Sequence, residues 1–129
     1  MSVLRADSGS IEAMTTVAQT SLADEIARVG RLGNLTAAHL AAATGGDPSS
    51  ARRWLRGTQV PSGAHATRTL ELCALVERLA YVMEPTYIPV WLLKPVARLD
   101  DRRPVDAIRG GDYRSVSRLI ASLEDMPVA

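Results

Sequence analysis

Paired stop and start signals for helices divide this chain into short segments, and they restrict its fold more than any other feature. Gly45-Gly46 is followed at once by Asp47-Pro48, which combines a favourable N-cap with proline at the first helical position. Further breaks lie at Pro61-Ser62-Gly63, at Pro85 and at Gly110-Gly111. Between the breaks, apolar residues recur at helical spacing, and no segment shows the sustained alternation of a strand. The sequence therefore predicts an all-α protein.

The expected helices differ greatly in length. The longest covers about residues 64–84, and its apolar stripe, which includes Leu72, Val76 and Leu79, is wider than one packing partner needs. We therefore expect a homodimer that buries part of this stripe. The other expected helical segments are residues 15–31, 36–43, 49–56, 87–93, 104–109 and 112–124, and residues 1–14 are expected to form a flexible tail.

The composition restricts the class of protein. Hydrophobic residues make up 47% of the 129 residues, which is enough for a buried core, but aromatic residues make up only 4% and phenylalanine is absent. The net charge of +1 does not by itself indicate a nucleic-acid-binding protein. Lys94 is the only lysine among 15 basic residues, and arginine suits phosphate, guanine edges and carboxylates. A GC-rich genome would produce the same bias.

Several classes of protein are excluded by what the sequence lacks. A single cysteine, Cys73, allows no disulfide within the chain and no metal site built on thiolates. No apolar run approaches the roughly 20 residues of a membrane span, and the N-terminus lacks a signal peptide, so we expect a cytoplasmic protein. His39 and His65 are not spaced as a metal pair, and no glycine-rich phosphate loop follows a strand. We therefore expect neither an enzyme nor a cofactor.

Residues 37–56 have the layout of a helix-turn-helix, inside an expected DNA-binding region of residues 15–63. The second helix must then project its first turns into the major groove, where serine and arginine can bind phosphates or base edges. A helical hairpin that only packs has the same layout, so both interpretations stay open. The outward residues that we expect to bind DNA are Ser49, Ser50, Arg52, Arg53 and Arg56.

Two segments carry a resemblance to known families. The run Trp54-Leu55-Arg56-Gly57, followed by Pro61, resembles the exit from the recognition helix in lambda-repressor-like domains of the Xre family. Residues 90–129 resemble the C-terminal domain of Xre/MbcA/ParS-type antitoxins. The chain departs from that pattern at Val96, at the loop of residues 100–102 and at Met126. The matching residues are Trp91-Leu92, Pro95, Leu99, Arg103-Pro104, Gly111-Asp112-Tyr113, Val116 and Leu119-Ile120.

This resemblance implies a partner, a RES-domain toxin that degrades NAD, whose active site the C-terminal region of the antitoxin covers. It also implies dimerisation and repression of the chain's own operon. The implied architecture is a lambda-repressor-like helix-turn-helix, a long linking helix of residues 64–85, and a small helical toxin-binding module of residues 86–129. The residues expected to bind the toxin are Trp91, Arg103, Pro104, Tyr113, Met126, Pro127, Val128 and Ala129.

Two classes of binding protein therefore remain. One is an antitoxin that also binds its operator, and the other is a stand-alone transcriptional regulator whose C-terminal module only dimerises. The apolar end at residues 126–129 could fill a cavity in a partner, with its carboxylate as a mimic of a substrate anion, or it could be an ordinary frayed terminus. The interleaved arginines and aspartates of residues 100–118 fit a partner surface or a solvated face equally well.

Overall fold

The computed structural model describes the backbone of residues 2–126, together with their side chains except those of residues 2–12, 15–17 and 20. Within this part the chain contains seven α-helices and two short 3₁₀ helices, and its only β-type pairing is one antiparallel bridge between Val96 and Arg102. The predicted all-α class is therefore confirmed. The elements are α1 (Ser2–Leu32), α2 (Ala37–Thr44), α3 (Pro48–Arg56), α4 (Gly63–Val82), η1 (Pro85–Tyr87), α5 (Ile88–Leu93), η2 (Ala97–Leu99), α6 (Pro104–Arg109) and α7 (Tyr113–Glu124).

Several helix boundaries follow from local caps that can be read from the sequence. The side chains of Thr36, Asp47 and Asp112 accept hydrogen bonds from backbone N–H groups in the first turns of α2, α3 and α7. Gly45 and Gly57 end α2 and α3 in the left-handed conformation, with φ of 79° and 78°. These interactions stay within a few residues, and the predicted segment 112–124 accordingly matches α7 closely. The predicted segment 104–109 matches α6, which begins with Pro104 and has no side-chain cap.

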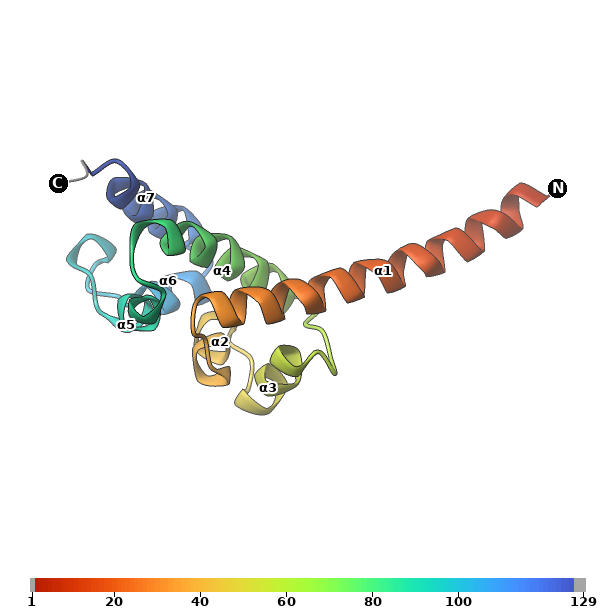
Figure 1. Ribbon diagram of the computed structural model, residues 1–129, viewed down its shortest axis with the longest axis horizontal. Helices are drawn as coiled ribbons and strands as arrows, with labels where there is room; N and C mark the ends of the chain where they lie inside the picture. Colours follow the sequence, from red (N-terminus) through yellow and green to blue (C-terminus); the bar gives the residue numbers. More distant parts are fainter. Residues whose placement is uncertain (1, 127–129) are drawn as a thin grey trace.

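Helix α1 is longer than the sequence pattern predicts. It begins at Ser2 and projects well beyond the rest of the molecule, whereas residues 1–14 were expected to form a flexible tail (Figure 1). No proline interrupts this stretch, and extending an existing helix adds one hydrogen bond per residue without a second nucleation cost. The weak apolar pattern near the N-terminus therefore does not prevent a helical backbone.

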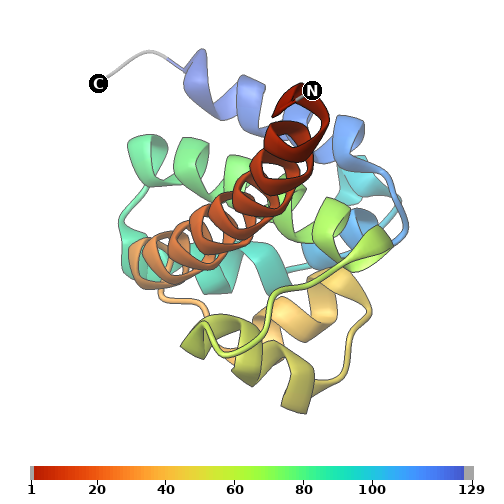
Figure 2. The ribbon, with the colours of Figure 1, turned by 90° about the vertical axis from the view of Figure 1, so that its right-hand side faces the viewer.

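Helix α4 forms the centre of the fold and packs against α1, α2, α5, α6 and α7. In Figure 2, α1 crosses one side of the bundle, with α7 above it and α3 below. Leu72, Val76 and Leu79 are fully buried inside the chain. The prediction that these three side chains form a homodimer surface is therefore wrong, because the wide apolar stripe serves several neighbours in the same chain.

One hydrophobic cluster connects all parts of the molecule. Its buried members extend from Ile26 in α1 to Ile120 in α7, and α2 contacts α6 almost as extensively as it contacts α3. The regions expected from the sequence, residues 15–63, 64–85 and 86–129, thus share a single core in the described part of the chain. A shared core couples the position of α3 to that of the C-terminal helices, since neither can move without opening the cluster.

Two glycines permit close packing inside this core. A Cβ atom at Gly46 would lie 2.7 Å from the ring of Trp54, and one at Gly33 would lie 2.6 Å from Val76 Cγ1. Both distances are far below van der Waals contact, so any side chain would push the neighbouring element away. The glycines therefore determine how closely α3 and α4 approach the segments before them.

Candidate functional site

The hairpin formed by α2 and α3 presents one face to the core and the other to solvent. Ala51 and Trp54 are buried, and the Trp54 ring lies 5.5 Å from the His65 ring with the planes tilted by 53°. Trp54 is therefore a core residue and not part of the exposed face. Because this large side chain is held between Gly46 and His65, the rotation of α3 about its own axis is well defined.

The outward face of α3 carries a connected set of polar side chains. Ser50 Oγ donates to Asp47 Oδ2 at 3.0 Å and accepts from Arg53 Nη2 at 3.1 Å, while Arg53 Nε donates to Gln59 Oε1 at 2.7 Å. Gln59 was missed in the sequence, where nothing marks a residue beyond the end of the helix as its neighbour. The predicted DNA-binding residues all lie on this face: Ser49, Arg52, Arg53 and Arg56 are exposed and Ser50 is half-buried.

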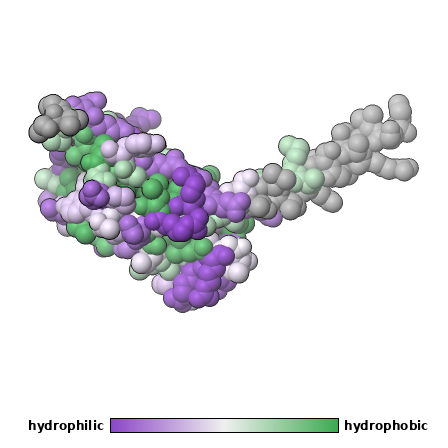
Figure 3. Space-filling model, viewed as in Figure 1, coloured by the Kyte–Doolittle hydropathy of each residue, from purple (hydrophilic) through white to green (hydrophobic). Residues whose placement is uncertain are grey.

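Positive charge on this face is largely uncompensated. Arg52, Arg53 and Arg56 form no salt bridge within the described residues, and Arg52 instead donates to Ser49 Oγ at 3.1 Å. Hydrogen bonds from Ser50 lower the pKa of Asp47, which therefore remains a capping carboxylate at neutral pH. Figure 3 shows hydrophilic residues gathered over α3. Such a surface can bind phosphate groups or guanine edges.

The residues that could have indicated catalysis have structural roles. Burial lowers the pKa of His39, whose Nδ1 accepts the Thr36 N–H at 2.9 Å and completes the cap of α2. Burial raises the pKa of the Cys73 thiol to about 12, so this residue is a protonated core side chain. The described residues contain no group of three or more potential metal ligands among histidine, cysteine, aspartate and glutamate. Nor does that part of the chain contain a helix long and apolar enough to cross a membrane.

The C-terminal residues predicted to bind a toxin differ in how far they are exposed to solvent. Trp91, Arg103 and Tyr113 are half-buried, and Arg103 pairs with Asp106 at 2.7 Å. Pro104 is buried at the first position of α6, which contradicts the prediction that it contacts a partner, because its own chain already covers it. Met126 is 63% exposed, and the other predicted tail residues, Pro127, Val128 and Ala129, lie outside the described residues.

The loop before α6 adopts a conformation that usually favours glycine. Asp100 and Asp101 have φ of 56° and 63°, in the left-handed region that aspartate tolerates better than most residues. Arg102 anchors the loop through a salt bridge to Asp112 at 2.8 Å. Residues 100–102 therefore form a compact turn, although they depart from the antitoxin pattern.

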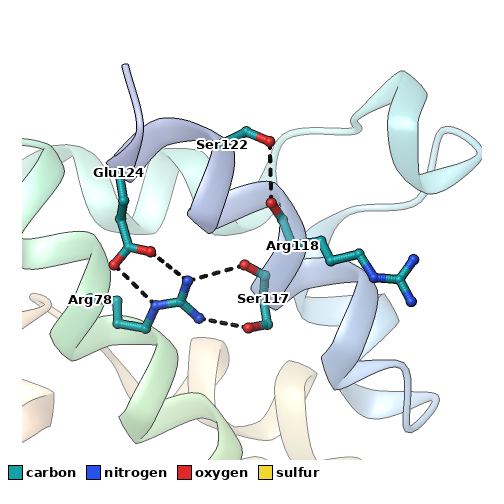
Figure 4. Close-up of polar contacts among 5 residues, drawn as sticks. All are labelled: Arg78, Ser117, Arg118, Ser122 and Glu124. Atoms are coloured by element: carbon teal, nitrogen blue, oxygen red, sulfur yellow. Dashed lines mark hydrogen bonds and ion pairs between the residues drawn. The ribbon is translucent and has the colours of Figure 1, made fainter. Parts of the chain in front are cut away.

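A long-range ion pair fixes α7 against α4 (Figure 4). Arg78 Nη2 lies 2.6 Å from Glu124 Oε1, and Arg78 Nη1 donates to Ser117 Oγ at 2.6 Å. The Arg78 guanidinium holds the pKa of Glu124 below its usual range. Nothing local in the sequence predicts this contact, because its members lie 46 positions apart.

Comparison with known proteins finds relatives of this chain. No protein-family model matches the chain. It is similar to the mycobacterial cidal antitoxin MbcA of Mycobacterium bovis and of Mycobacterium tuberculosis, in each case 33% identical over 78 residues, which are 60% of this chain and 69% of the relative. These relatives are antitoxins.

A solved structure extends the similarity beyond the aligned segment. The chain matches a chain in the crystal structure of the M. tuberculosis MbcT–MbcA toxin–antitoxin complex with a TM-score of 0.72 and 30% sequence identity. The match covers 83% of this chain and 97% of that one. The resemblance inferred from the C-terminal motifs is thus confirmed. The chain belongs to the family of the mycobacterial cidal antitoxin MbcA.

Proposed function

We propose that this chain is the antitoxin of a type II toxin–antitoxin pair, and that it neutralises a RES-domain, NAD-degrading toxin by covering the active site. The observation that carries the proposal is the structural match over 97% of a chain in a toxin–antitoxin complex. The RES class of the toxin and its NAD chemistry follow from the resemblance of residues 90–129 to antitoxin C-terminal domains.

The C-terminal region of residues 86–129 has the physical properties of a binding surface. Helices α5, α6 and α7 are packed on α4, so little conformational entropy is lost when a partner binds them. Trp91 and Tyr113 are half-buried aromatic side chains of the kind that anchor interfaces. Met126, largely exposed after α7, leads into the apolar end of the chain, which in this proposal enters the NAD pocket and excludes substrate.

Co-purification and an enzymatic assay test this proposal together. The full chain is co-expressed with a RES-domain toxin encoded beside it, and NAD consumption is measured for the toxin alone and for the purified complex. We expect a stable complex that consumes no NAD, whereas the free toxin does. A chain that neither binds nor inhibits the toxin contradicts the proposal.

A second role, repression of its own operon, is favoured by the uncompensated arginines on α3. Arg53 is held by Ser50 and Gln59, so its guanidinium is already oriented before DNA arrives. Gel shift with the promoter region is expected to show binding that weakens steeply as salt rises. The alternative, a stand-alone regulator, predicts the same gel shift but no complex with any RES-domain toxin.

We also propose that the chain forms a homodimer, because a dimer with two-fold symmetry fits a pseudo-palindromic operator. The contact must use other side chains than Leu72, Val76 and Leu79. Exposed apolar residues of α1 and α4 are the candidates: Leu70, which is 52% exposed and lines a groove between the two helices, and Met14, which is 70% exposed. A monomer in light scattering at high micromolar concentration contradicts this part.

A further inference from the structure

A shallow groove between η2 and α7 brings together two arginines from separate elements. Its lining consists of Arg98, Leu99, Ser115, Arg118 and Leu119. In Figure 4, the Arg118 side chain points away from the Arg78–Glu124 ion pair. The arginine is therefore not needed to hold α7 on α4, although it lies on the same helix.

The groove is positively charged and lacks an internal counter-ion. Arg98 Nη1 donates to Ser122 Oγ at 3.4 Å, and neither Arg98 nor Arg118 forms a salt bridge among the residues that the structure describes. Arg114 is exposed one helical turn before Arg118, and like charges at this spacing destabilise a helix. Four arginines elsewhere in the C-terminal half do have carboxylate partners: Arg68, Arg78, Arg102 and Arg103.

We propose that this basic groove binds carboxylate side chains of a protein partner. The inference rests on the proposed function, in which that partner is the toxin, and it adds a charged contact site to the helix that leads into the tail. Arginine and carboxylate form strong, often bidentate hydrogen bonds, and such complementarity increases both specificity and association rate.

The surroundings of the groove favour a protein partner over nucleic acid. Half-buried Leu119 gives the groove an apolar side, which suits a protein surface better than a phosphate backbone. Helix α7, which forms one side of the groove, lies on the opposite side of α4 from α3 (Figures 1 and 2). DNA bound along α3 would therefore not extend into the groove.

The first test measures affinity for the toxin with charge-reversed variants of the full chain. Arg118→Glu and Arg98→Glu are each expected to weaken binding about tenfold and to reduce its salt dependence. Arg31→Glu is the matched control, since Arg31 is exposed on α1 and outside every surface proposed here. Circular dichroism confirms that each variant is folded. Unchanged toxin affinity in both groove variants overturns the inference.

The second test needs no toxin and therefore separates this inference from the proposed function. The isotope-labelled full chain is titrated with a ten-residue glutamate peptide and, in parallel, with a DNA duplex. The peptide is expected to shift the amide signals of Ser115, Leu119 and Ser122 in the wild-type chain but not in Arg118→Glu, while DNA shifts signals of α3. If the wild-type chain binds no toxin, the proposed function is wrong, and the peptide titration alone then tests whether the groove binds carboxylates. Peptide shifts that are absent from the groove, or DNA shifts that centre on it, overturn the inference.

Discussion

The two arginine-bearing surfaces of this molecule are assembled in different ways. On α3, the arginines belong to one short helix, and their hydrogen-bond partners Ser49, Ser50 and Gln59 lie within a few residues of them. At the C-terminal end, Arg78 of α4 holds α7 through Glu124, which lies 46 positions later in the sequence. The groove beside α7 is lined in part by Arg98, which belongs to η2. The first surface can be recognised from local sequence, whereas the second exists only once the core has formed.

The largest expected effect comes from removing the side chain that positions α3. Trp54→Ala should lower the free energy of unfolding by about 3–5 kcal/mol, because it leaves a cavity in the shared core. Urea unfolding followed by circular dichroism measures the change. Since one cluster joins both surfaces, we expect a single transition, and two separated transitions would contradict the shared core.

The matched control for this variant is Tyr81→Ala. Tyr81 is also a large aromatic residue, but it is 91% exposed, so its truncation should change stability by no more than about 0.5 kcal/mol. A comparable loss in both variants would mean that Trp54 has no special role in the core.

Deleting residues 126–129 should separate binding from inhibition at the C-terminal surface. The complex with the toxin should still form, because anchors such as Trp91 and Tyr113 remain, but the toxin should regain NAD consumption. Val128→Asp should act in the same direction by placing a charge in an apolar site. Co-purification and an NAD assay check both properties. A truncated chain that inhibits as well as the full chain rules out a plug formed by the tail.

On α3, the contribution of one arginine can be measured directly. Arg53→Ala should cost about 1–3 kcal/mol of operator binding free energy, as expected for an arginine that reads a base. Gln59→Ala should cost less, because the charge remains and only its orientation is lost. Gel shifts at fixed salt compare both variants with Arg31→Ala. Equal affinity in all three variants and the wild-type chain would exclude base reading by Arg53.

The smallest expected effect concerns acid stability of the α4–α7 contact. Because Arg78 lowers the pKa of Glu124 in the folded state, this pair stabilises the fold above the ordinary pKa of glutamate, and the contribution is lost as pH falls through the lower folded value. Urea unfolding at pH 6 and pH 3 should therefore show a smaller pH dependence in Glu124→Gln. An identical pH dependence in the variant and the wild-type chain would show that the pair contributes nothing.

The candidate DNA surface was largely predictable from residues alone, and the C-terminal surface only in part. The outward positions of α3 followed from helical periodicity, so Ser49, Arg52 and Arg53 were correctly placed on its exposed face. In the C-terminal region, a motif match identified the segment but could not distinguish exposed Met126 from buried Pro104. Burial depends on which elements cover a residue, and a motif carries no information about that.

The sequence by itself determined the helical class and the ends of helices such as α2 and α3, because caps such as Asp47 and Gly57 act through hydrogen bonds within four or five residues. The tertiary structure alone decided what the apolar stripe of α4 faces. From periodicity, Leu72 and Val76 could equally have packed against a second copy of the chain or against other helices of this one. Apolar contact is non-directional, so the pattern specifies that a face is buried but not which partner buries it.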